Sequence, residues 1–258
     1  MSSSLVCELV NKTLINEEFF TLQFCWDHQS PRAGQFFMLK PVRSCVFLPR
    51  PIGIFEYDHE QKLVKFLISK RGKGTDELSQ LNAGEKVQLT GPIGNCWADF
   101  LPENGTAALV GGSAGVAPLA ALVAEKQDYT FNFYAGFRQG FSEKEEEDLI
   151  LGYAVKSKKV IVTAEDGRNA LIGRVTDFIF HPENFDVILG CGPPAMLSAL
   201  KKKCQEKNVP CFLSMESRLA CGVGACFGCT VQSVNGSRRC CKEGPIFPAE
   251  EVIFNDSI

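Results

Sequence analysis

Five of the chain's 12 cysteines are gathered in one short stretch near its carboxyl end. Three of them, Cys221, Cys226 and Cys229, have the spacing C-x4-C-x2-C, and two more, Cys240 and Cys241, follow. This spacing is the plant-type pattern for a [2Fe–2S] cluster, in which a distant fourth thiolate joins three from one loop. Glycines between the cysteines permit the backbone angles of such a loop and bring amide N–H groups close to the sulfur atoms. The stretch therefore predicts an electron-transfer centre.

Zinc ligands and disulfides are the alternative interpretations of these cysteines. A structural zinc site usually pairs two C-x2-C knuckles, and this stretch contains only one. Disulfides need an oxidising compartment, and the first residues lack the basic and apolar regions of a signal peptide. The seven other cysteines have no ligand spacing, and most of them suit packing in the core of a protein in a reducing cytoplasm. They are Cys7, Cys25, Cys45, Cys96, Cys191, Cys204 and Cys211.

Charge and hydropathy exclude several classes of partner. The formal net charge of −3 gives no reason to expect binding to nucleic acid or to an anionic membrane. No apolar run reaches the roughly 18 residues that a membrane span requires. A length of 258 residues is enough for two modest domains and a short appendage. We therefore expect a soluble, cytoplasmic protein.

Residues 1–100 predict an antiparallel β-barrel domain. Short apolar runs at 19–24, 35–39 and 63–68 are separated by Gly, Pro, Asp and Asn turn signals. Four prolines between residues 31 and 51 argue against long helices in this region. A small barrel is the economical way to pair such strands.

Residues 101–213 predict an α/β domain with a parallel sheet, and residues 214–258 form a third, cysteine-containing segment. Alternation of strands and helices indicates parallel strands with both faces of the sheet covered. The expected strands are 106–110, 130–135, 160–164, 186–190 and 210–215, and the expected helices are 116–126, 144–155, 173–180 and 195–208.

Two glycine-containing turns follow strands of this second domain. Gly112 and Gly115 lie in a strand-to-helix turn, where backbone amides and the positive end of a helix can hold a phosphate. The turn lacks a complete G-x-G-x-x-G, so an ordinary tight turn explains it about equally well. The second turn, 190–196, contains Cys191. Its side chain either faces a nicotinamide or packs in the protein interior. Turns at neighbouring strand ends can hold the two halves of a dinucleotide.

Arg50 and Pro51 are the corresponding candidates in the first domain. A guanidinium offers a planar fork of donors that suits a pyrophosphate, although a solvent-exposed arginine is the ordinary alternative. The segments 73–75 and 91–94 are ambiguous, because both are also typical of turns.

Taken together, these segments resemble the ferredoxin–NADP reductase superfamily. The order of the superfamily is followed by Arg50-Pro51, Gly74-Thr75, Gly91–Asn95, Gly115–Pro118 and Cys191–Pro193. The tail 214–229, followed by Cys241–Phe247, is more specific and resembles the electron-transfer subunits of NAD-dependent (class 1B) dihydroorotate dehydrogenases. The resemblance covers nearly the whole chain and implies an FAD-binding barrel, an NAD-binding α/β domain and a carboxyl-terminal [2Fe–2S] segment.

The resemblance also implies roles for individual residues. Cys241 is preferred to its neighbour Cys240 as fourth cluster ligand because the family places its last cysteine directly before an x-x-Gly-Pro-x-Phe run. Cys191 and Glu216 are candidates for the junction of flavin and nicotinamide, without a catalytic base among them. The implied FAD contacts are Arg50, Pro51, Ile52, Gly53, Leu67, Ile68, Ser69, Gly74 and Thr75, the dinucleotide turn contains Gly112 and Gly115, and the cluster ligands are Cys221, Cys226, Cys229 and Cys241.

Three residues depart from the family pattern, and the choice between NAD and NADP stays open. Gly53 stands where the flavin motif has Ser or Thr, Ser113 where the phosphate turn has glycine, and Cys96 where a glycine precedes the aromatic residue. NAD rather than NADP is implied by the resemblance alone. No acidic residue stands clearly where it would bind the ribose 2′-hydroxyl of NAD. Arg138, just after a strand, either binds the 2′-phosphate of NADP or is an ordinary arginine exposed to solvent.

The implied activity is electron transfer in pyrimidine biosynthesis. Electrons from dihydroorotate would pass through a partner FMN-containing catalytic subunit to [2Fe–2S], to FAD and to NAD+, in a heterotetramer of two plus two subunits. One alternative is a diaphorase subunit of a hydrogenase, sulfide dehydrogenase or sulfite reductase. A second alternative, which the departures at Gly53 and Ser113 keep open, is a non-catalytic iron–sulfur or zinc interaction protein.

Overall fold

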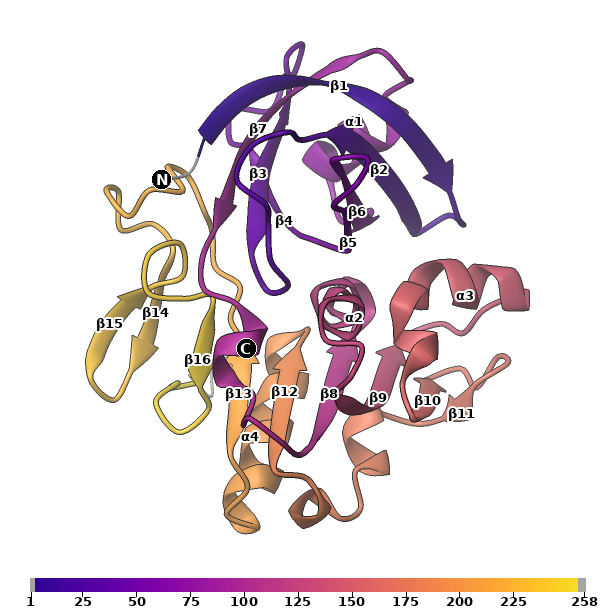
Figure 1. The fold of residues 1–258 in the computed structure, drawn as a ribbon, viewed down its shortest axis with the longest axis vertical. Coiled ribbons are helices and arrows are strands. Elements are labelled where there is room, and N and C mark those ends of the chain that lie inside the picture. The colour runs from indigo at the N-terminus through magenta and orange to yellow at the C-terminus, as the bar shows by residue number, and fades with distance from the viewer. Residues whose placement is uncertain (1–2, 255–258) are drawn as a thin grey trace.

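The computed structural model describes residues 3–254, whose first domain is a curved antiparallel sheet (Figure 1). Seven strands lie in the order β4-β3-β7-β1-β2-β6-β5. Their bounds are β1 (Ser3–Leu14), β2 (Phe19–Cys25), β3 (Phe36–Pro41), β4 (Arg50–Gly53), β5 (Glu56–Asp58), β6 (Leu63–Ser69) and β7 (Lys86–Ile93). The first half of β1 pairs with β7 and the second half with β2, so one long strand carries the sheet around its core. The expected barrel architecture is confirmed.

Aromatic side chains fill the inside of this sheet. Phe20, Phe24, Phe37 and Phe66 are completely buried there. Phe37 contacts Phe66 in an edge-to-face arrangement with ring centroids 5.5 Å apart. Because alternate residues of a strand point to the same side of a sheet, these rings lie on one face.

A short helix, α1 (Lys73–Gln80), follows β6 where the sequence suggests only a turn. The hydroxyl oxygen of Thr75 accepts hydrogen bonds from the backbone N–H groups of Arg71 (2.8 Å) and Gly72 (3.3 Å). Leu78 is the helix's fully buried apolar side chain. Because α1 is only eight residues long and contains a single large apolar side chain, it lacks the repeated apolar positions by which helices are predicted.

The second domain is built on a sheet of order β11-β10-β9-β8-β12-β13-β16, in which every pair is parallel except β13 with β16. Its elements are β8 (Thr106–Gly112), α2 (Val116–Glu125), β9 (Thr130–Phe137), α3 (Lys144–Leu151), β10 (Lys159–Ala164), β11 (Leu171–Ile172), β12 (Val187–Cys191), α4 (Pro194–Glu206), β13 (Cys211–Ser214) and β16 (Ile246–Pro248). Leu109 and Leu189 face the α2 side, whereas Ala108 and Ile188 face the α4 side. The expected parallel sheet with two covered faces is confirmed.

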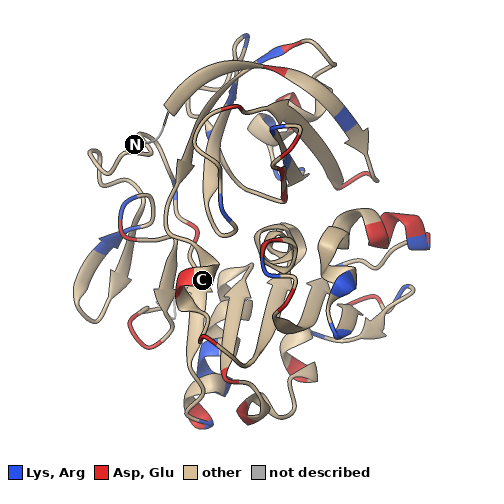
Figure 2. Cartoon of the chain, viewed as in Figure 1, with Lys and Arg blue, Asp and Glu red and all other residues tan. Residues whose placement is uncertain are grey.

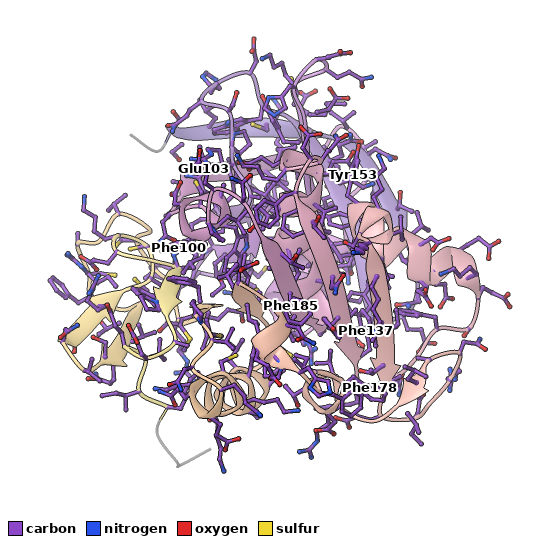
Figure 3. The ribbon with its side chains drawn as sticks, turned by 60° about the horizontal axis from the view of Figure 1, so that its bottom comes forward. Phe100, Glu103, Phe137, Tyr153, Phe178 and Phe185 are labelled. Atoms are coloured by element: carbon purple, nitrogen blue, oxygen red, sulfur yellow. The ribbon has the colours of Figure 1, made fainter. Side chains whose placement is uncertain are left out.

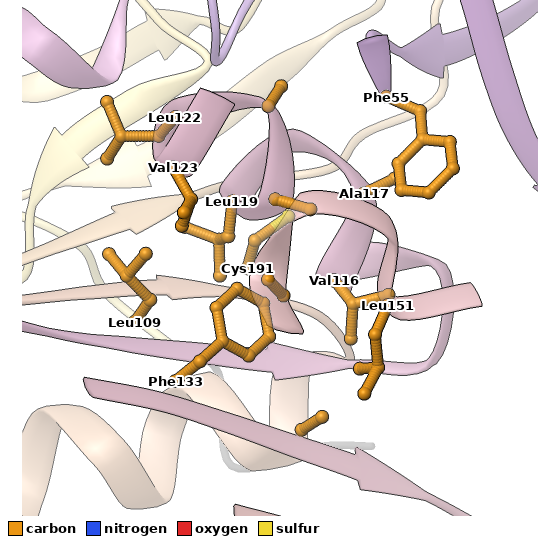
Figure 4. Close-up of a cluster of buried hydrophobic side chains, with 14 of the residues drawn as sticks. Phe55, Leu109, Val116, Ala117, Leu119, Leu122, Val123, Phe133, Leu151 and Cys191 are labelled. Carbon is orange, nitrogen blue, oxygen red and sulfur yellow. The ribbon is translucent and has the colours of Figure 1, made fainter. Parts of the chain in front are cut away.

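Helix α2 lies between the two sheets and joins the domains (Figures 1 and 4). Phe55 of the first domain packs near Ala117 of α2, and Leu109 and Phe133 of the second sheet belong to the same buried cluster. Gly152 allows the close approach of Phe55, because a β-carbon on Gly152 would lie 2.4 Å from the Phe55 ring.

Two expected helices of the second domain are wrong in whole or in part. The predicted helix 173–180 is only a 3₁₀ turn, Val175–Phe178. Gly173 has a φ of +129°, and the β-branched and aromatic residues that follow have low helix propensity. The predicted helix 144–155 ends as an α-helix at Leu151, because Gly152 takes a φ of +52°, and it continues as a 3₁₀ turn.

The cysteine-containing segment packs along one edge of both domains (Figure 1). It contains a hairpin of β14 (Thr230–Ser233) and β15 (Gly236–Arg239), and its strand β16 extends the second sheet. Asn95 ties the segment to the first domain: its side-chain amide donates to the Ile246 carbonyl (2.9 Å) and accepts from the Ile246 N–H (3.0 Å).

Charged residues of both signs are distributed along the chain, with an acidic group in the first turn of α3 (Figure 2). Within residues 3–254, none of the helices combines the length and the apolar character needed to cross a bilayer. The interspersed charges agree with the near-balanced net charge of the sequence.

Candidate functional site

A cleft of about 1600 Å³ runs between the antiparallel sheet and the carboxyl edge of the parallel sheet. Its walls include β4 and the end of β6 on one side, and the residues that follow β8, β9, β10 and β12 on the other. Phe137, at the end of β9, is one of the aromatic side chains at this edge (Figure 3). Ligands of open α/β sheets bind beyond the carboxyl ends of the strands, and single ligand sites usually occupy about 300–1,000 Å³. The cleft has room for more than one large ligand.

The candidate FAD residues of the first domain lie in or directly behind this cleft. Its lining contains Arg50, Pro51, Ile52, Gly53, Leu67, Ile68, Ser69 and Thr75. Gly74 lies behind Arg50, and a β-carbon there would be 2.0 Å from the Arg50 Nε atom. Only glycine therefore lets the guanidinium lie over the first turn of α1, where cation and helix amides together favour an anion. This arrangement of the Arg50 guanidinium over the first turn of α1, here called the cradle, fits a pyrophosphate.

Gly53 is not required by space. A β-carbon on Gly53 would make ordinary contacts of 3.6 Å with the Pro118 ring. The missing hydroxyl of the flavin motif is therefore a change in hydrogen bonding, and the structure gives no steric reason for it.

The two glycine turns of the second domain meet at neighbouring strand ends, as their positions in the sequence suggest. Cys191 of β12 pairs with Gly111 of β8. A β-carbon on Gly115 would lie 2.3 Å from the Cys191 carbonyl oxygen, and one on Gly112 would lie 2.7 Å from Pro193. These glycines allow both turns to approach each other at the start of α2, where backbone amides face the cleft.

Ser113 has a φ of +51°, which explains why a glycine is usual at this position. Its hydroxyl accepts a hydrogen bond from Arg71 Nη2 (2.8 Å), and Arg71 also pairs with Glu18 (3.2 Å). Arg71 and Glu18 belong to the first domain, so this network joins the domains across the cleft. The sequence analysis missed both residues, because no local pattern relates positions so far apart in the chain.

Cys191 and Glu216 lie at the same end of the cleft. Burial raises the pKa of the Cys191 thiol far above its usual range, with a further contribution from Glu216. Desolvation also raises the pKa of the Glu216 carboxyl, partly offset by the Arg71 guanidinium. Burial therefore makes the charged form of each group less favourable than it would be in water.

The candidate cluster cysteines form two pairs. The backbone N–H of Cys226 donates to Cys221 Sγ (3.4 Å), and the N–H of Gly228 donates to Cys226 Sγ (3.4 Å). Cys229 Sγ and Cys241 Sγ lie 3.3 Å apart. Desolvation raises the pKa of Cys221, but backbone N–H groups of the loop outweigh it and lower the pKa to about 6. Among residues 3–254, no three candidate ligands converge on a single metal-ion position, so the thiols lie as two separate pairs. Two thiol pairs and sulfur-directed amides suit a cluster of two irons in which each iron binds two thiolates.

Cys240 and Cys241 point in different directions although they are adjacent. Cys241 faces Cys229, whereas Cys240 is buried and lines the cleft near Glu216. The backbone N–H of Cys240 donates to the Cys229 carbonyl (3.0 Å), which fixes this orientation. The cysteine pairs and the cleft thus share a wall.

Comparisons with known proteins agree with this arrangement. Residues 216–253 match the family model described as the iron-sulfur cluster binding domain of dihydroorotate dehydrogenase B. The chain is 40% identical to a dihydroorotate dehydrogenase B (NAD(+)) electron transfer subunit of Clostridium acetobutylicum, with 87% of each chain covered. It is 35% identical to the subunit of the same name from Listeria innocua, with 95% of this chain and 97% of the relative covered.

Solved structures show the same architecture. An NADH-dependent reduced ferredoxin-NADP oxidoreductase, studied for flavin-based electron bifurcation, superposes with a TM-score of 0.82 at 25% identity, covering 96% of this chain and 89% of that chain. A ferredoxin reductase of carbazole 1,9a-dioxygenase gives a TM-score of 0.67 at 18% identity, covering 81% and 67%. The second similarity concerns the fold alone.

Proposed function

Because the chain belongs to the family of electron-transfer subunits of dihydroorotate dehydrogenase B (NAD(+)), we propose that it transfers electrons from a catalytic partner subunit, where dihydroorotate is oxidised, to NAD+. The reaction serves pyrimidine biosynthesis. The observation that carries the proposal is that the candidate cluster site and the cleft are adjacent. Cys241 lies beside Cys229 in the cluster site, and its neighbour Cys240 lines the cleft. One chain thus combines a site for a one-electron carrier with a cleft for a two-electron acceptor.

The cofactors are FAD, a [2Fe–2S] cluster and NAD. When bound, the cluster exchanges single electrons, NAD takes two with a proton, and FAD can do both. The residues of this chain bind and orient the three groups and exclude water between them. No side chain of the cleft needs to act as a general base in that scheme.

For FAD, we assign the pyrophosphate to Arg50 and to the first turn of α1, with Gly74 and Thr75 shaping the turn. The planar guanidinium and its place over the first turn of α1, at the positive end of the helix, support this assignment. The flavin ring is assigned to the remaining FAD residues. These are Pro51, Ile52 and Gly53 on β4 and Leu67, Ile68 and Ser69 on β6.

For NAD, we assign the phosphates to the turn of Gly112 and Gly115 and the nicotinamide to the end of the cleft near Cys191 and Glu216. The positions of both side chains in the cleft, at the carboxyl ends of β12 and β13, support this assignment, because ligands of open α/β sheets bind beyond those ends. Cys191 and Glu216 would then be the side chains that contact a bound nicotinamide.

For the cluster, we assign Cys221 with Cys226 to one iron and Cys229 with Cys241 to the other. The two sulfur pairs support this set, and the direction of the Cys240 side chain argues against Cys240 as a ligand. We propose three domains: residues 1–100 bind FAD, residues 101–213 bind NAD and residues 214–258 bind the cluster. Residues 1–2 and 255–258 lie outside the part of the chain that the structure describes.

The catalytic partner is expected to dock beside Cys221. A hollow of about 260 Å³ lies there, and the side chains of Val223 and Phe227 are 58% and 64% exposed in the same loop. Exposed apolar side chains around a redox centre suit a protein interface. Val223→Glu should weaken the complex without loss of cofactors, and an unchanged complex would remove this surface from the proposal. The family suggests two copies of each subunit, which the mass of the complex in sedimentation experiments would test.

The function is tested by anaerobic co-purification with a class 1B catalytic subunit from the same genome and an assay of dihydroorotate-dependent NAD+ reduction. We expect activity only when both chains are present. A complex with full FAD and iron that shows only NADH-to-dye activity would instead identify a diaphorase subunit with a different partner.

A further inference from the structure

We propose that Arg239 and Glu243 form a charge pair that positions the cysteine loop and sets the reduction potential of the cluster. This inference rests on the proposed cluster site. Neither residue is a candidate ligand, and both lie two positions from Cys241, one on each side. The two charged residues therefore flank Cys241, the proposed fourth ligand, in the sequence.

The two side chains are joined by several hydrogen bonds. Arg239 Nε donates to both carboxylate oxygens of Glu243, at 3.2 and 3.1 Å, and Nη2 forms a further contact. The Arg239 backbone N–H donates to the same carboxylate (2.7 Å), and the Glu243 N–H donates to the Arg239 carbonyl (2.9 Å). Both side chains are about one quarter exposed, so solvent screens them less than a free surface pair. The pair is a fixed part of the turn after β15.

The guanidinium also contacts the cysteine loop at two points. Arg239 Nη1 donates to the Gly224 carbonyl at 2.8 Å, and the guanidinium carbon lies 4.8 Å from the centre of the Phe227 ring. Gly224 and Phe227 have φ values of +79° and +56°. A left-handed conformation is uncommon for phenylalanine and needs support from its surroundings. Arg239 gives that support through a hydrogen bond and a cation–π contact.

The pair places its positive end within the cysteine segment. Arg239 lies two residues before Cys241 and donates to the carbonyl of Gly224 in the loop between Cys221 and Cys226, while its other side faces the Glu243 carboxylate. Reduction adds one negative charge to a cluster, so a nearby cation stabilises the reduced form. Loss of the guanidinium would leave Glu243 unpaired and lower the potential. Loss of the carboxylate would leave Arg239 unpaired and raise it.

Opposite shifts from the two halves of one ion pair separate this role from a merely structural one. The other charges nearby do not share the geometry. Lys242 follows Cys241 directly, and Arg238 pairs with Glu251 at 3.4 Å while lying over Phe247. Arg238 is therefore a matched control: the same residue type, one position earlier, engaged with a different partner.

The test is a potentiometric titration of the cluster in the FAD-loaded chain, followed by electron paramagnetic resonance. The variants are Arg239→Gln, Glu243→Gln, their combination, Arg239→Lys and the control Arg238→Gln. At the wild-type midpoint, we expect the ratio of reduced to oxidised cluster to fall at least threefold in Arg239→Gln and to rise at least threefold in Glu243→Gln. Threefold corresponds to about 28 mV for one electron.

The double variant and Arg238→Gln should remain within twofold of wild type. Arg239→Lys should keep the potential but change the line shape, because lysine keeps the charge and loses the forked contacts. Should Arg239→Gln fail to retain iron, Glu243→Gln still decides the question of potential. Shifts of the same sign, or no shift in either single variant, would overturn the inference, whereas a wild-type chain that holds no cluster would overturn the proposed site itself.

Discussion

Gly74→Ala should weaken FAD binding without destabilising the fold. The new β-carbon would lie 2.0 Å from Arg50 Nε and 2.7 Å from its Cζ, so the guanidinium must leave its position over α1. A charge-assisted hydrogen bond contributes about 1.5–3 kcal/mol, and loss of one bond to the pyrophosphate predicts roughly 10- to 150-fold weaker FAD binding. Alanine in place of glycine inside a helix should itself stabilise α1 by about 0.5–1 kcal/mol.

The assay is titration of the apoprotein with FAD, followed by flavin fluorescence, together with the melting temperature of the apoprotein. Gln80→Ala, at the exposed end of the same helix, is the control and should leave FAD affinity unchanged. Arg50→Ala should weaken binding at least as much as Gly74→Ala. An FAD affinity within twofold of wild type in Gly74→Ala would refute the account of the cradle. A lower melting temperature of the apoprotein would show that the substitution acts through the fold instead.

Three further predictions concern the cysteine loop and the core. Cys226→Ser should abolish the visible and paramagnetic signals of the cluster while FAD remains bound, whereas Cys240→Ser should keep them; loss of the signals in Cys240→Ser would contradict the ligand set. In iron-free protein, alkylation of Cys221 followed by mass spectrometry should rise with pH around a midpoint near 6, because its lowered pKa leaves the thiolate as the main form above that pH; a midpoint above 8 would be inconsistent with the loop geometry. Leu119→Ala, at a fully buried position of α2, should lower the free energy of unfolding by about 2–5 kcal/mol in denaturant titrations, and a loss below 1 kcal/mol would indicate that the interior between the domains is less well packed than the structure implies.

Elements whose signals are local could be predicted from the sequence. The spacing of Cys221, Cys226 and Cys229 indicates a shared loop because the residues between them are few and include glycine. The strands and helices of the parallel sheet follow from apolar runs and turn signals of ordinary length. The helix expected at 173–180 is wrong because apolar content alone does not overcome Gly173 and the β-branched residues after it.

Features that depend on distant partners could not be predicted. The network of Glu18, Arg71 and Ser113 exists only because the two domains meet across the cleft. The hairpin β14–β15 is local, but its strands are short and polar, so the apolar runs that indicate the other strands do not mark it. Adjacent cysteines have identical local signals, and only the fold gives Cys240 and Cys241 different surroundings.

The central claim is that one chain connects a cysteine-bound cluster to a dinucleotide cleft. Anaerobic titration of the purified chain with NADH, followed by visible absorbance and electron paramagnetic resonance, tests it most directly. The account predicts that the flavin bleaches and that the cluster signal appears in the same titration, and that Cys226→Ser keeps only the bleaching. A flavin that bleaches in wild-type protein while a fully loaded cluster remains oxidised would contradict the claim.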